Sequence, residues 1–65
     1  MTQQEKDFLL IEYNNVIMNA DSMISKLHYL SQFDDNYLLI TELNKFSNLM
    51  KQKLVDIEAT DVKEE

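Results

Sequence analysis

The chain has 65 residues with no cysteine, glycine or proline, and its 12 acidic residues against six lysines give a net charge of −6. At this length it forms a single domain, whose core alone contributes only about 3–5 kcal/mol of stability. Disulfides are excluded and a lone histidine gives no basis for a structural metal, so we expect association with another chain to supplement the core. Nucleic acid is an unfavourable partner, because an acidic surface without arginine repels phosphates.

The first predicted element is a helix over about 3–31. Thr2 and Glu5 fit a capping box, which predicts a helix start at about residue 3. An apolar ladder follows, and its spacing alternates between four and three residues as expected for helix packing. Its members are Leu9, Tyr13, Val16, Ala20, Met23, Leu27 and Leu30. A second row, Leu10, Ile17 and Ile24, widens this face beyond the needs of a two-stranded coiled coil and favours a helix bundle.

The ladder fails at Asp34, which predicts a turn at about 32–35 and a second helix at about 35–58. Asp34 or Asp35 is the expected N-cap of this helix. Its apolar stripe is centred on Leu43, Met50 and Ile57 and flanked by Leu39, Ile40, Phe46 and Leu54. One continuous helix of nearly 60 residues, with a stammer near Phe33, is the alternative. The hairpin is favoured because polar capping residues cluster where the register changes, and because it buries both stripes.

The hairpin also has consequences for charged residues. An antiparallel arrangement is expected to bring Glu5, Asp7 and Glu12 near Lys51 and Lys53. Residues 1–58 form the predicted hairpin domain, and residues 59–65 are expected to form an acidic flexible tail.

The longest apolar run, 37–40, is far shorter than the ~20 residues that span a bilayer. Because the N-terminus also lacks a secretory signal pattern, we expect a cytoplasmic protein.

Catalytic chemistry has no candidate residues. The acidic residues nearest to His28 at helical spacing are seven positions away, about 10 Å along a helix, which is too far for joint metal coordination. No cysteine is present, and no serine lies in a nucleophile motif. We therefore expect no catalytic, cofactor-binding or metal-binding residue, and no enzymatic activity.

Binding surfaces are the remaining candidates. The predicted core and association residues are Leu9, Tyr13, Val16, Ala20, Met23, Leu27, Leu30, Leu43, Phe46, Met50, Leu54 and Ile57. A second set lies opposite the main stripes and is a candidate partner surface, consisting of Phe8, Ile11, Met18 and Tyr29 with Leu38 and Leu49. Methionine and tyrosine suit adaptable interfaces. The bland alternative is that these are scattered surface residues, which are common in soluble proteins.

Two families of small helical hairpins resemble the chain. The opening Met1-Thr2-Gln3-Gln4-Glu5-Lys6 and the hairpin length are similar to the plasmid copy-number regulator Rop, which implies a four-helix-bundle dimer that binds RNA. That similarity covers six residues, and the outward positions of helix 1 carry Ile11, Met18 and acidic neighbours instead of a basic face. The chain also resembles the small co-chaperones of type III secretion needle subunits, over most of its length and with Tyr37 opening helix 2. This resemblance implies a protein that keeps an aggregation-prone subunit soluble.

The sequence thus predicts an all-α antiparallel hairpin that associates into a helix bundle, either as a homodimer or in a heterocomplex. The expected function is non-enzymatic protein binding, as a small chaperone or adaptor that packs on an amphipathic helix. A Rop-like RNA-binding regulator and an acidic inhibitor that mimics nucleic acid are the alternatives.

Overall fold

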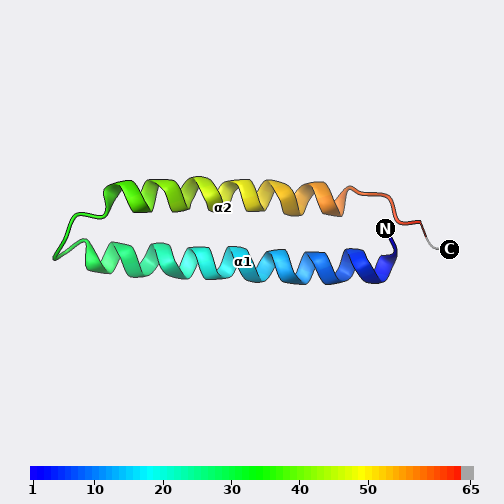
Figure 1. Ribbon diagram of the computed structural model, residues 1–65, viewed down its shortest axis with the longest axis horizontal. Helices are drawn as coiled ribbons and strands as arrows, with labels where there is room; N and C mark the ends of the chain where they lie inside the picture. The colour runs from blue at the N-terminus through cyan, green and yellow to red at the C-terminus, as the bar shows by residue number, and fades with distance from the viewer. Residues whose placement is uncertain (64–65) are drawn as a thin grey trace.

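The computed structural model describes residues 1–63 and consists of two antiparallel helices joined by a short loop (Figure 1). Helix α1 (Gln3–Leu30) has 28 residues and helix α2 (Tyr37–Glu58) has 22. The helices lie side by side, and residues 1 and 63, the first and last that the structure describes, are at the end opposite the loop. This confirms the all-α hairpin and excludes the continuous helix. Neither helix is long and apolar enough to cross a membrane.

The N-terminus of α1 has the predicted capping box. The backbone N–H of Glu5 donates to Thr2 Oγ1 at 3.2 Å, and the backbone N–H of Thr2 donates to Glu5 Oε1 at 3.1 Å. These two bonds satisfy amides that the first turn leaves without helical partners. The backbone N–H of Thr2, and secondly its side chain, stabilise the carboxylate and lower the pKa of Glu5 below its usual 4.5.

This capping box predicts a pH-dependent contribution to stability. Because the pKa of Glu5 is lower in the folded chain than in the unfolded chain, its contribution is complete above pH 4.5 and is lost as the pH falls through the folded-state pKa. Glu5→Gln resembles the protonated side chain. We therefore expect the melting temperature of this variant to lie below that of the wild type at pH 7, with the gap closing under acid conditions.

The matched control is Asp34→Asn, which removes one loop carboxylate that makes no side-chain hydrogen bond. Thermal melts followed by circular dichroism at several pH values measure the gap for both variants. A gap for Glu5→Gln that stays constant from pH 7 to acid would contradict the role assigned to the carboxylate.

The loop corrects the expected start of the second helix. Its N-cap is Asn36, not Asp34 or Asp35, and Asn36 makes no side-chain capping bond. Asp35, the residue before this N-cap, makes a capping bond instead. Its Oδ1 accepts a hydrogen bond from the backbone N–H of Tyr37 at 3.0 Å. The carboxylate thus satisfies the first amide of α2 although its own residue lies outside the cap position.

The two helices meet along a seam of alternating three- and four-residue steps. The seam residues are Leu10, Tyr13, Ile17, Ala20, Ile24 and Leu27 of α1 with Ile40, Leu43, Ser47, Met50, Leu54 and Ile57 of α2. Ala20 and Ser47 are the most buried, at 1% and 2% exposure. Ser47 Oγ donates to Asp21 Oδ1 at 3.0 Å across the helices. The two small residues permit close approach, and the hydrogen bond places residue 21 opposite residue 47.

The open end of the hairpin is closed by backbone acceptors. Lys6 Nζ donates to the carbonyls of Glu58 and Thr60 at 2.8 and 3.0 Å. The backbone N–H of Lys63 donates to the carbonyl of Met1 at 2.9 Å. Residues 59–63, expected to belong to a solvated tail, therefore lie against the start of α1, because these bonds satisfy the last carbonyls of α2. Glu64 and Glu65 of the expected tail lie outside the described residues.

The expected ion pairs between the helices do not form in the described part of the chain. Lys51 and Lys53 pair with none of Glu5, Asp7 and Glu12, and the ion pair found at residues 1–63 joins Lys45 to Glu42 within α2, at 3.3 Å. The reason is geometric, because the bond between Ser47 and Asp21 places Lys51 and Lys53 level with about residues 15–17 of α1, well beyond Glu5 and Asp7. The helices are therefore held together by the seam and by hydrogen bonds.

The hairpin is a single thin layer. Its Cα atoms span 55 × 14 × 9 Å with a radius of gyration of 15.5 Å, whereas a compact domain of this length has a radius of about 11 Å. Its buried apolar side chains are Ile17, Ala20, Ile40 and Ile57. Because the hairpin is only one layer thick, both of its broad sides are accessible to solvent or to another molecule.

Candidate protein-binding surface

One broad side of the hairpin is lined by apolar side chains. All but one of these residues directly precede a seam residue, and in antiparallel helices a step backward turns both helices toward the same side. The exception, Leu30, continues the seven-residue spacing of this row beyond the last seam position of α1. We call this side the front face and define it as Leu9, Val16, Met23 and Leu30 of α1 with Leu39, Phe46 and Lys53 of α2. Six of these seven side chains are apolar.

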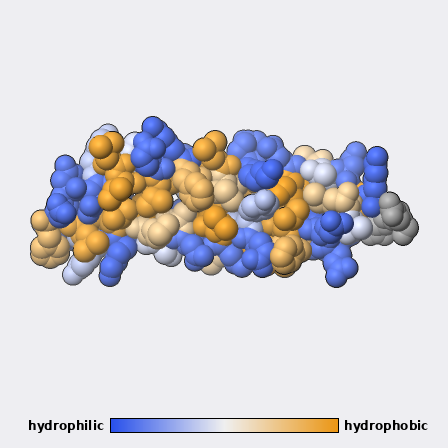
Figure 2. Space-filling model, viewed as in Figure 1, coloured by the Kyte–Doolittle hydropathy of each residue, from blue (hydrophilic) through white to orange (hydrophobic). Residues whose placement is uncertain are grey.

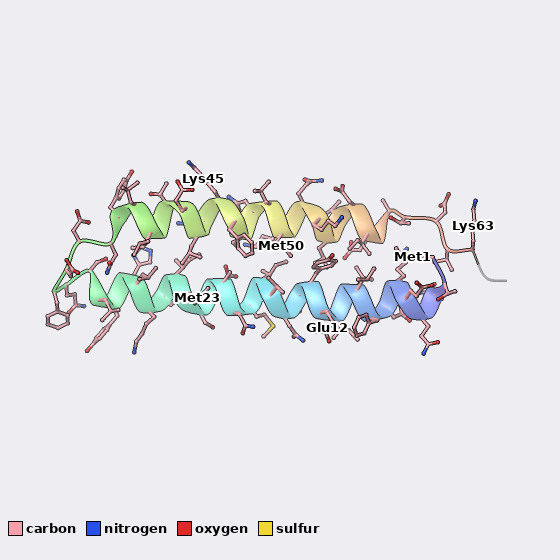
Figure 3. The ribbon with its side chains drawn as sticks, in the orientation of Figure 1. Met1, Glu12, Met23, Lys45, Met50 and Lys63 are labelled. Carbon is pink, nitrogen blue, oxygen red and sulfur yellow. The ribbon has the colours of Figure 1, made fainter. Side chains whose placement is uncertain are left out.

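The front face is largely open to solvent. Met23 is 50% and Leu39 is 55% exposed, and Val16, Leu30 and Phe46 are also exposed. Figure 2 shows this side, with apolar surface over both helices that is densest toward the loop end. In the same view the labelled Met23 lies on α1 and Met50 lies between the helices, while Lys45 points away from α1 (Figure 3). Exposed apolar area of this extent on one face is typical of an interaction surface.

The opposite side, which we call the back face, is polar. The residues that follow seam positions on this side are Asn14, Asp21 and His28 of α1 and Asn44, Lys51 and Glu58 of α2. All six are exposed. The contrast between the two faces shows that the hairpin is amphipathic as a whole, in addition to each helix being amphipathic. Of these two broad faces, it is the front face that has the composition of a packing surface.

The structure divides the predicted ladder between two environments. Tyr13, Ala20 and Leu27 lie in the seam, whereas Leu9, Val16, Met23 and Leu30 lie on the front face. The apolar side of α1 therefore covers both the contact with α2 and the adjoining part of the front face. On α2, Leu43, Met50, Leu54 and Ile57 lie in the seam, and Phe46 lies on the front face. In both helices the apolar side begins in the seam and extends onto the front face.

The candidate partner residues form two separate groups. Phe8, Ile11, Met18 and Tyr29 are all exposed and lie on the side of α1 that points away from α2. We call them the outer patch. Leu38 and Leu49 are also exposed, but they lie on the side of α2 that points away from α1. The structure thus does not bring the six residues together into one surface.

Two structural features are not evident from the sequence pattern. Ser47 was not assigned to the core because serine is polar, although it lies seven positions from both Ile40 and Leu54 in the seam. Lys6, for which the sequence pattern predicts no role, closes the open end through two carbonyls. A seven-residue spacing could have identified Ser47, but no local signal identifies the role of Lys6.

In residues 1–63, no three His, Cys, Asp or Glu side chains are grouped so that they could hold a metal ion. His28 is exposed on the back face. No protein-family model, curated protein or solved structure matches the chain.

Proposed function

We propose that the chain is a non-enzymatic protein-binding module, a small chaperone or adaptor that acts by packing its helices against an amphipathic helix of another protein. The observation that carries this proposal is the exposure of large apolar side chains on two separate sides of a two-helix layer, the front face and the outer patch. A helix presents apolar residues at spacings of three, four and seven, and such a stripe fits a surface made of parallel apolar rows.

The outer patch is the proposed target-binding surface. Ile11 and Met18 lie seven positions apart on the same line of α1, and Tyr29 lies near that line toward the loop. Met18 is 59% exposed, so a partner can reach it without opening the hairpin. Flexible methionine and amphipathic tyrosine adapt to irregular apolar partners, which suits a chaperone that holds a subunit before assembly.

The positions of the charged residues favour this function over nucleic-acid binding. Lys6 and Lys45 are engaged by protein acceptors. Lys51 lies on the back face and Lys53 on the front face, so the cations do not form one stripe that could follow a phosphate backbone. The carboxylates gather mainly toward the two ends of the hairpin, which does not resemble the regular array of a nucleic-acid mimic.

The test compares two double variants of the tagged full-length chain in the cells that produce it. We expect the wild type to retain one protein in near-stoichiometric amount. Ile11→Glu with Met18→Glu should reduce that retention by at least about tenfold, equivalent to about 1.4 kcal/mol. The control, Asn44→Glu with Asn48→Glu, adds the same charge at exposed polar positions of α2, away from the outer patch, and should retain the protein. Circular dichroism checks that both variants keep their helical content.

Two outcomes would count against the proposed function. One is the absence of any stoichiometric partner of the wild type. The other is a partner that both double variants retain equally, which would place binding outside the outer patch.

A further inference from the structure

We propose that the front face is covered by the front face of a second copy of the chain, which forms a four-helix bundle with both loops at the same end. In this arrangement α1 of each copy lies over α2 of the other, and the two-fold axis runs parallel to the helices. The inference concerns the front face alone and leaves the outer patch free for another protein.

The exposed area of the chain supports a partner of this size. The hairpin exposes 5123 Å², whereas a compact monomer of 7.7 kDa exposes about 4,300 Å². The difference is about 800 Å², which is also the area that each partner typically buries in a stable protein interface. A second copy laid along the front face removes an area of this order from water and adds the second layer that the hairpin lacks.

The apolar rows of two copies coincide when the loops are at the same end. A two-fold axis parallel to the helices keeps every residue at its own height, and the bond between Asp21 and Ser47 defines which heights correspond. Met23 is then level with Phe46 of the second copy to within about one residue. Leu30 is similarly level with Leu39 of the second copy, and Val16 with the alkyl stem of its Lys53.

Charge favours the same orientation. Toward the open end, Glu12 lies beside the apolar row of α1, and Lys53 belongs to the front face of α2. With the loops together, Glu12 lies within one helical turn of Lys53 of the second copy, so opposite charges meet. With the loops apart, Glu12 lies against the apolar half of the second copy between Met23 and Leu30. Burying a carboxylate there without a partner is unfavourable.

The test measures distances between the two copies by pulsed electron paramagnetic resonance. Because the chain has no cysteine, a single introduced cysteine carries the only nitroxide label of each copy. Gln32→Cys places the label in the exposed loop, and Lys51→Cys places it on the back face near mid-height of the hairpin. The loop label reports orientation, whereas the Lys51→Cys label reports dimer formation in either orientation.

We expect a loop-to-loop distance below about 35 Å, because helix layers pack about 10 Å apart and each label adds several ångström. Lys51→Cys should also give a defined distance. Loops at opposite ends would instead give a loop distance near the 55 Å length of the hairpin and would overturn the proposal. The absence of a dipolar signal from both labels, in fully labelled and helical protein, would overturn it as well.

Discussion

Replacement of Ala20 by aspartate is expected to abolish the helical structure of the chain. Ala20 is 1% exposed and lies in the middle of the seam, next to the level where Ser47 donates to Asp21. A carboxylate there is buried without a cation, at a cost of about 3–5 kcal/mol. That cost equals the stability that a core of this size provides, so the variant should unfold at room temperature. Far-ultraviolet circular dichroism measures the loss of helix.

The matched control is Ser22→Asp, which adds the same charge two positions away on the exposed outer side of α1. It should keep its helical content and nearly all of its melting temperature. If Ala20→Asp also kept both, the seam would not be the core of the protein.

Replacement of Met23 by glutamate should dissociate the bundle while costing a single hairpin little. Met23 is half exposed in the hairpin, so its new carboxylate remains hydrated there, but it becomes buried when the front face is covered. We expect the dissociation constant to rise at least about 100-fold, equivalent to about 2.7 kcal/mol. Analytical size exclusion over a range of concentrations measures the change, and helical content should become concentration-dependent.

Met18→Glu provides the control, because it changes the same residue type on the same helix, at 59% exposure and on the outer patch. This variant should remain a dimer. Equal dissociation constants for the two variants would show that the front face is not the dimer interface, whereas loss of a target protein by Met18→Glu alone would separate the two surfaces.

Local signals in the sequence were enough to predict the hairpin. The capping box of Thr2 and Glu5 is complete within four residues, and the ladder failed at Asp34, close to the loop that the structure shows. The expected N-cap of α2, Asp34 or Asp35, lies one or two residues before Asn36, because aspartate and asparagine both favour this position and no glycine or proline marks the turn. The choice between Asp35 and Asn36 depends on backbone geometry.

The environment of the ladder could not be derived from periodicity. A repeat of three and four residues defines the direction in which an apolar side points, but the neighbour that occupies that direction depends on where the other helix lies. Once α2 is in place, Ala20 lies in the seam, whereas Val16 and Met23 lie on the front face. Burial of Ser47 likewise becomes evident only when its position opposite Asp21 is known.

The most direct test of the central claim is sedimentation equilibrium of the purified wild-type chain at micromolar concentrations. A covered front face predicts a helical species of twice the 7.7 kDa chain mass, whose melting temperature rises with concentration. A stably folded, fully helical monomer of 7.7 kDa at every concentration would contradict the claim that association supplements the core.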